Sequence, residues 1–178
     1  MESIIFLDID GVLVTTRGTD YWLKTKCDIF EDNSCYELFC PNSVEALNKL
    51  IRLTDSKIVV ISSWRRTLTL SQIREKFKSR GVKGEILGVT PYLNDEIERG
   101  REIELWMQKN GTPKSYVIID DDCDVDIMDK YFPNDRCVQT SVALGIAGKY
   151  SYKRAISILN KPVEVKKPKK DTTKTKLF

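Results

Sequence analysis

Residues 4–13 read IIFLDIDGVL, an apolar, β-branched run that ends in two carboxylates and a glycine. The pattern is typical of a buried strand that leads into a turn. Residues two apart in a strand point to the same face, so Asp8 and Asp10 can converge, although the turn at Gly11 can redirect Asp10. Two carboxylates this close repel each other unless a cation or a shared proton compensates, and several oxygens together suit a hard ion such as Mg²⁺. We therefore expect a functional site at these carboxylates. The alternative is a surface turn that is merely rich in Asp.

Two further apolar runs also end in polar side chains. Residues 116–119 read YVII and precede three carboxylates, whereas residues 58–61 read IVVI and precede the tetrapeptide SSWR. The first run offers more acids, and the second offers hydroxyls, backbone donors and a guanidinium, which fit a phosphate. In open parallel sheets the ligand crevice lies at the carboxyl ends of the strands. We expect the three runs to direct their polar ends to one place.

The rest of the chain alternates between strand and helix patterns. Strands are predicted over residues 4–9, 58–61, 85–87, 116–119 and 136–139, and helices over residues 43–53, 70–79, 98–109, 125–131 and 152–159. Residues 10–40 are predicted to be irregular. Such alternation indicates an α/β protein with a parallel sheet.

Composition agrees with one domain followed by a basic tail. The chain has 178 residues, of which 41% are hydrophobic and 31% charged, enough for one full core. Residues 161–176 hold seven Lys against two acids, a charge of +5, which leaves the rest of the chain at −2 of the net +3. We expect a domain over residues 1–160 and a disordered tail over residues 161–178 that either attracts nucleic acid or only solubilises the domain.

Several functional classes are disfavoured. No apolar stretch approaches the length of a membrane span and no signal peptide is recognisable, so we expect a cytoplasmic protein without membrane contact. The five cysteines are an odd number without CxxC spacing, which favours reduced thiols, and a zinc site at Cys27, Cys35 and Cys40 lacks a fourth ligand. The chain has no His, so carboxylates are the plausible proton carriers near neutral pH.

The first run matches DxDGx(V/T)L, the first motif of the haloacid dehalogenase superfamily, and the chain resembles the phosphatases of that superfamily. Ser62 matches the second motif, a Ser or Thr that closes an apolar strand. Arg99-Gly100 matches the third, a Lys or Arg at a helix start, and Asp120-Asp121 matches the acidic pair of the fourth. The chain further resembles the subgroup found in Swiss Army Knife RNA-repair proteins through Trp64-Arg65, residues 99–106, residues 120–122 and Val138-Gln139-Thr140.

The resemblance implies a three-layer, Rossmann-like parallel sheet flanked by helices, either capless or with a small flap hairpin between residues 13 and 41. Asp8 would be the nucleophile and Asp10 the general acid and base. Ser62 and Arg99 would hold the transferring oxygens. Mg²⁺ would be bound by Asp8, Asp120, Asp121 and the backbone carbonyl of Asp10.

Other roles remain open for several of these residues. We expect substrate contacts from Ser63, Trp64, Arg65 and Gly100, with packing as the alternative for Trp64. Ser62 can equally cap the next helix. Other cations compete with Arg99, namely Arg65, Lys83, Arg101 and Lys114. Asp122 and Asp124 either orient the acidic pair or cap a helix.

These expectations combine into a Mg²⁺-dependent phosphomonoesterase with an aspartyl-phosphate intermediate. Because the insertions are short, the crevice would be open to a large phosphorylated substrate, and we expect a nucleic-acid end or a nucleotide phosphate. The alternatives are a phosphoprotein phosphatase and a catalytically idle domain that binds phosphorylated ends.

Overall fold

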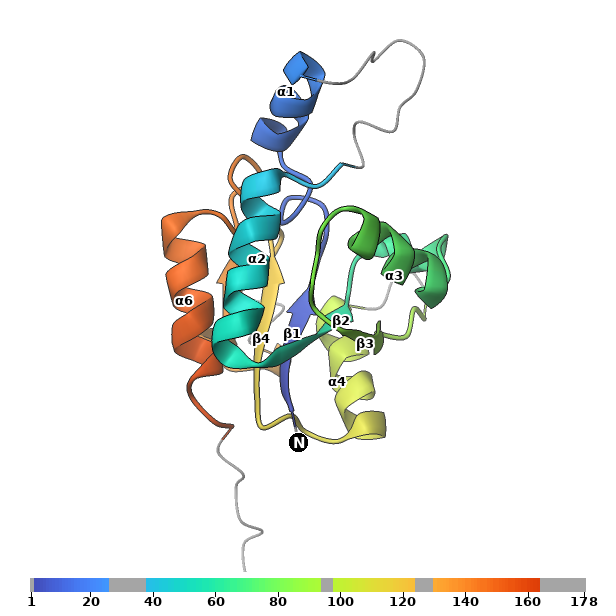
Figure 1. Ribbon diagram of the computed structural model, residues 1–178. Helices are drawn as coiled ribbons and strands as arrows, with labels where there is room; N and C mark the ends of the chain where they lie inside the picture. Colours follow the sequence, from blue (N-terminus) through green and yellow to red (C-terminus); the bar gives the residue numbers. More distant parts are fainter. Residues whose placement is uncertain (1, 26–37, 94–97, 124–129, 164–178) are drawn as a thin grey trace, which may run out of the picture.

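The computed structural model describes residues 2–25, 38–93, 98–123 and 130–163 (Figure 1). One parallel sheet has the strand order β3-β2-β1-β4-β5, with bounds β1 Ser3–Leu7, β2 Ser56–Val60, β3 Ile86–Val89, β4 Ser115–Asp120 and β5 Cys137–Gln139. The described helices are α1 Thr16–Thr25, α2 Pro41–Thr54, α3 Leu70–Ser79, α4 Arg99–Asn110 and α6 Lys149–Leu159, with short 3₁₀ turns η2 Ser63–Arg66 and η3 Asn134–Arg136. The predicted α/β class with a parallel sheet is confirmed.

The central position of β1 explains its uninterrupted apolar sequence. Ile5 and Leu7 belong to the core on one face of the sheet, together with side chains of α2, α3 and α6. Ile4 and Phe6 belong to the core on the other face, with Ile103 of α4. Figure 1 shows α2 and α6 side by side over the first face and α4 on the opposite side. A strand buried on both faces needs apolar residues at every position.

The register of the sheet aligns the polar ends of the strands. Leu7 pairs with Val60 of β2 and with Ile119 of β4. One residue further along, the Asp8 amide donates to the Ile119 carbonyl at 3.0 Å, and the Ile61 amide donates to the Leu7 carbonyl at 2.9 Å. The residues that follow the three strands therefore start from one level of the sheet.

Helix α1 occupies part of the segment predicted to be irregular, and it also replaces part of the expected flap hairpin. The Thr15 hydroxyl accepts the Gly18 amide at 3.0 Å and so caps the helix start. Gly18 lowers helix propensity, but it is buried where an added Cβ would meet Cys40 at 2.7 Å, and the Trp22 indole donates to the Phe39 carbonyl at 3.0 Å. Tertiary contacts thus override the local preference.

Other differences from the predicted elements are small, and some predictions lie outside the described residues. Strand β1 ends at Leu7, so Asp8 follows the strand. The helix predicted over residues 125–131 and the tail beyond residue 163 fall largely outside the described ranges. Within those ranges, none of the helices combines the length and the apolar character that a membrane crossing requires.

The loop after β5 depends on one glycine. Gly145 has φ +56°, and its amide donates to the Ser141 carbonyl at 2.7 Å, while Ile146 donates to the Val12 carbonyl at 3.2 Å. An added Cβ at this position would overlap the Val12 carbonyl oxygen. The loop after β1 and the loop after β5 therefore approach each other at a point where only glycine fits.

We expect Gly145→Ala to lower the free energy of unfolding by roughly 2 kcal/mol or more, because it combines a left-handed backbone with a steric clash. Gly88→Ala is the matched control, since an added Cβ there meets its nearest neighbour, Trp106 Nε1, at 3.9 Å. Urea unfolding followed by circular dichroism measures both. Equal stability of the two variants would contradict the packing described for this loop.

Candidate active site

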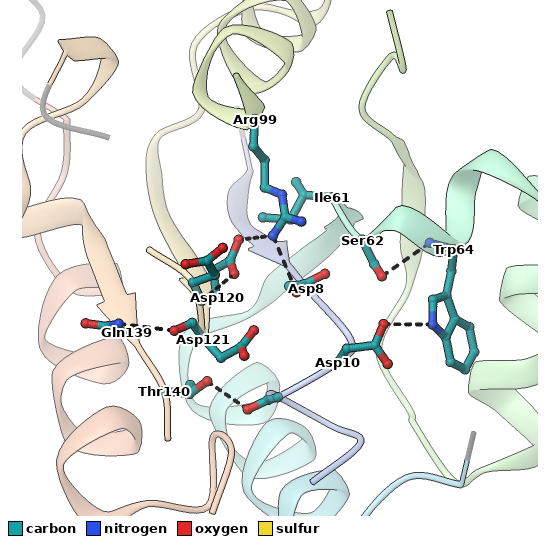
Figure 2. A network of polar contacts seen from close by, with 12 residues as sticks. Asp8, Asp10, Ile61, Ser62, Trp64, Arg99, Asp120, Asp121, Gln139 and Thr140 are labelled. Atoms are coloured by element: carbon teal, nitrogen blue, oxygen red, sulfur yellow. Dashed lines mark hydrogen bonds and ion pairs between the residues drawn. The ribbon is translucent and has the colours of Figure 1, made fainter. Parts of the chain in front are cut away.

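Three carboxylates meet at the carboxyl edge of the sheet (Figure 2). Asp8 follows β1, Asp120 ends β4 and Asp121 comes next, and each offers an oxygen that lies within 4.8 Å of those of the other two. Asp8 is 5% exposed and Asp120 is completely buried, whereas Asp121 is half-buried. The structure thus brings together three of the four predicted metal ligands.

Arg99, the first residue of α4, supplies the positive charge that faces this cluster. Its Nη1 forms an ion pair with Asp120 Oδ2 and lies 3.4 Å from Asp8 Oδ2. Among the competing cations, Arg65 pairs with Glu102 and Arg101 pairs with Glu104. The geometry therefore favours Arg99 for the cationic role.

Contacts at the start of α4 position Arg99. Glu98 accepts hydrogen bonds from the Tyr131 hydroxyl at 2.5 Å and from the Lys130 ammonium at 3.0 Å. Gly100 is buried, and a Cβ there would overlap the Tyr131 ring. The structure shows Gly100 packed against Tyr131, and its predicted contact with substrate stays a prediction.

The charges in the cluster perturb one another strongly. Burial above all, together with Asp120, raises the pKa of Asp8 to about 7, although Arg99 and hydrogen bonds from the Ile9 backbone and Ser62 lower it. Burial also raises the pKa of Asp121, with a further contribution from Asp120. Burial alone would lower the pKa of Arg99, but Asp120 and Asp8 reverse this and raise it.

The donor set fits a hard divalent cation. Three carboxylates face one guanidinium, so an ionised cluster keeps an excess of negative charge in a largely buried place. Asp120 is already engaged, since its Oδ2 faces Arg99 and its Oδ1 accepts the Asp122 amide at 3.0 Å. Carboxylate oxygens are the ligands that Mg²⁺ prefers, and the excess charge matches its valence.

Asp10 points away from the cluster, as Figure 2 shows. Its exposed side chain accepts a hydrogen bond from Trp64 Nε1 at 3.0 Å. The Trp64 ring is held in turn by Phe39, with ring centroids 6.2 Å apart, and by the cations of Lys76 and Arg80. Trp64 therefore orients Asp10. The sequence provided only the general expectation that the indole N–H of a packed Trp finds a hydrogen-bond acceptor, without indicating which one.

Ser62 caps the turn that follows β2 and contacts Asp8, and its predicted role in holding the transferring oxygens stays a prediction. It is completely buried and caps η2, where its hydroxyl oxygen accepts the Trp64 amide at 3.4 Å. Its side chain also forms a hydrogen bond that lowers the pKa of Asp8. Ser63, next along the chain, is exposed.

The structure places the side chain of Arg65, which is predicted to contact substrate, in an ion pair inside the protein. Only 4% of the side chain is exposed, and its guanidinium donates to the Ile61 and Ser62 carbonyls and pairs with Glu102. Burial raises the pKa of Glu102 and lowers that of Arg65, which disfavours the charged form of each side chain. The attraction between the two charges opposes this desolvation cost. Glu102 was missed because an acid in a helix sequence normally indicates a solvated face.

Residues at the end of β5 hold the two loops that carry the acidic residues, namely the loop after β1 and the loop after β4. Gln139 Nε2 donates to the Asp121 carbonyl at 3.1 Å, and the Thr140 hydroxyl donates to the Gly11 carbonyl at 2.9 Å. Gly11 has φ +66°, and a Cβ there would overlap the carboxyl group of Asp121. Asp122 is exposed, and Asp124 lies outside the described residues.

Comparison with known proteins agrees with this arrangement. A family model described as the HAD domain in Swiss Army Knife RNA repair proteins matches residues 4–149. The chain belongs to this family of haloacid dehalogenase (HAD) domains, and membership supports a HAD-type phosphatase at the level of the family. Searches of curated proteins and of solved structures gave no significant match.

The raised pKa of Asp8 predicts a pH dependence of stability in the metal-free protein. Because the folded state favours the protonated carboxyl, the stabilisation is present below pH 4 and is lost as the pH rises towards 7. In EDTA, Tm should therefore fall between pH 5 and pH 8, and Mg²⁺ should recover it at pH 8.

Asp8→Asn should flatten this profile, while Asp20→Asn on the exposed face of α1 should preserve it. Differential scanning fluorimetry in EDTA measures all three proteins. A wild-type Tm that rises with pH, or an unchanged slope in Asp8→Asn, would contradict the assignment.

Proposed function

We propose that the protein is a Mg²⁺-dependent phosphomonoesterase that acts through an aspartyl-phosphate on a nucleic-acid end or a nucleotide phosphate. One observation carries this proposal, namely the position of Asp8 in contact with a cation, a hydroxyl and two further carboxylates. A carboxylate nucleophile needs positive charge around it before it can approach a phosphate dianion.

In the first step, a carboxylate oxygen of Asp8 attacks phosphorus and the bond from phosphorus to the ester oxygen breaks. The leaving oxygen takes a proton from Asp10. In the second step, a water oxygen attacks phosphorus, Asp10 accepts the water proton, and the bond between phosphorus and Asp8 breaks to release phosphate. Asp10 thus returns to its initial protonation state.

The surrounding residues orient these groups. The Trp64 indole fixes the Asp10 carboxyl, and Ser62 and Arg99 offer donors to the oxygens that gain charge in the transition state. Arg65 and Glu102 hold the backbone of residues 61 and 62 in place. Asp8, Asp120 and Asp121 would hold Mg²⁺, which when bound neutralises repulsion between the nucleophile and the phosphate.

The size of the insertions favours a large substrate. Between β1 and α2, residues 16–25 form one helix, and the whole segment is too short for a cap domain. The family description names RNA repair proteins, and residues 164–178 are rich in Lys, so a phosphorylated polynucleotide end is the preferred substrate. A phosphoprotein would also reach such a site, and an idle domain would bind a phosphorylated end without cleaving it.

Asp8→Asn should lower kcat by a factor on the order of 10³ or more, because the variant keeps the shape of the side chain but removes the attacking anion. Asp10→Asn should lower kcat by roughly 10² to 10⁴ through loss of proton transfer. A colorimetric phosphate assay on a small aryl phosphate measures both. EDTA should abolish the activity of the wild-type protein in the same assay. Near-normal turnover in Asp8→Asn would refute covalent catalysis at this residue.

Substrate size is tested by comparing kcat/KM for a phosphorylated oligonucleotide with that for the matching mononucleotide. We expect the oligonucleotide to be preferred and the preference to shrink as salt rises, since phosphate contacts are screened. Removal of residues 164–178 should reduce the preference. This truncation keeps Pro162 and Val163, which contact Arg136 and Lys114.

Equal or better turnover of the mononucleotide at low salt would contradict the polynucleotide assignment. Activity confined to phosphopeptides would favour the phosphoprotein alternative, and binding of phosphorylated ends without any turnover would favour the idle domain.

A further inference from the structure

A pocket of about 450 Å³ lies between α1, the side of α2 that runs from Pro41 to Arg52, and the turn after α3. Four cations and one carboxylate line it, together with an aromatic and apolar floor. Its charged residues are Lys49, Arg52, Arg80, Lys83 and Glu45, and its floor includes Trp22, Phe39 and Val44. The pocket therefore combines an excess of positive charge with aromatic surface.

Hydrogen bonds hold the walls of this pocket in place. The Asn48 side chain donates to the Gly81 carbonyl at 2.9 Å and accepts the Lys83 amide at 2.8 Å, which fixes the turn after α3 against α2. The Trp22 indole donates to the Phe39 carbonyl at 3.0 Å, which fixes α1 against the start of α2. A pocket whose walls are already ordered spends less free energy on binding.

The pocket adjoins the candidate active site through aromatic contacts. The Arg80 guanidinium lies 5.1 Å from the Phe39 ring centroid and 5.7 Å from that of Trp64. Trp64 in turn donates to Asp10 at 3.0 Å (Figure 2). Two side chains therefore connect the pocket wall to Asp10.

We propose that this pocket binds a single-stranded polynucleotide, at the nucleotides immediately behind the phosphorylated end. Phosphates would lie against the exposed cations of Arg52 and Lys83, and a base would stack on Trp22. Neutralised phosphates and stacked bases are the two sources of affinity for single strands. An acidic peptide would satisfy the cations but would leave the aromatic surface unused. The inference rests on the proposed function for the placement of the phosphorylated end at Asp8.

The test uses the full chain and a fluorescein-labelled, unphosphorylated decanucleotide, so that binding is measured without turnover. R52A/K83A removes two exposed cations for which the structure gives no side-chain hydrogen bond, and the matched control K109A/K114A removes two exposed cations that do not line the pocket. Anisotropy titrations at several salt concentrations give Kd. We expect R52A/K83A to lower the slope of log Kd against log salt by about 1.4, since each phosphate contact to a single strand contributes about 0.7. The control should keep the wild-type slope.

Variants of Trp22 test the stacking contact. Trp22→Leu should weaken binding by about tenfold, whereas Trp22→Phe should restore most of the affinity, because Phe keeps a stacking face. Phe lacks the indole N–H, so its rescue separates stacking from the hydrogen bond to the Phe39 carbonyl. Equal losses in Leu and Phe variants would overturn the stacking role.

Further outcomes decide the proposal. Equal weakening by R52A/K83A and K109A/K114A would overturn it, because only bulk charge would then matter. Competition by a polyglutamate peptide of equal charge as strong as that by the oligonucleotide would also overturn it, in favour of an acidic protein. Binding of either the RNA or the DNA decamer supports the proposal, and the tighter one identifies the sugar. If R52A/K83A lowers Tm, glutamine at both positions replaces alanine.

Hydrolysis of a small aryl phosphate, measured on the same wild-type preparation, separates the two proposals. Hydrolysis without decanucleotide binding keeps the proposed function and rejects the pocket. Decanucleotide binding without hydrolysis keeps the pocket and rejects the proposed function.

Discussion

Repulsion among the carboxylates of Asp8, Asp120 and Asp121 is the constraint on which the rest of the site depends. The parallel register brings their oxygens within 4.8 Å, and burial removes most of the water that would screen them. Neighbouring residues either supply positive charge that compensates the carboxylates or hold in place the backbone that carries them. Arg99 provides the first compensation, and the contacts of Glu98 with Lys130 and Tyr131 keep the start of α4 where Arg99 can reach.

The strand ends were predictable because one physical rule governs them. Apolar runs such as residues 4–7 are buried on both sides of a parallel sheet, and the residues that follow them meet at one edge. The motifs at Asp8, Ser62 and Asp120 could therefore be located from sequence, and their convergence could be expected. Helix α1 could not, since Gly18 weakens the local signal and only contacts with Cys40 and Phe39 reveal why a helix forms.

The supporting contacts were also beyond prediction, because they join residues far apart in the chain. Glu102 lies 37 residues from Arg65, and nothing in a helical segment of mixed charge distinguishes a buried acid from a solvated one. Trp64 and Asp10 are 54 residues apart. Gln139 and Thr140 could be singled out from sequence only through the family resemblance. Their physical role is to hold the loops that carry Gly11 and Asp121, and this role becomes visible only in the folded structure.

The hydrogen bond between Trp64 and Asp10 makes the two oxygens of this carboxyl group unequal. An indole N–H donates and never accepts, so Oδ2 of Asp10 must remain an acceptor as long as the contact lasts. A proton that Asp10 carries is therefore favoured on Oδ1, since the carbonyl oxygen is the better acceptor for the indole. The carboxyl group is directional as a result: Trp64 holds the Oδ2 side, and Oδ1 is the oxygen on which a proton is gained or lost.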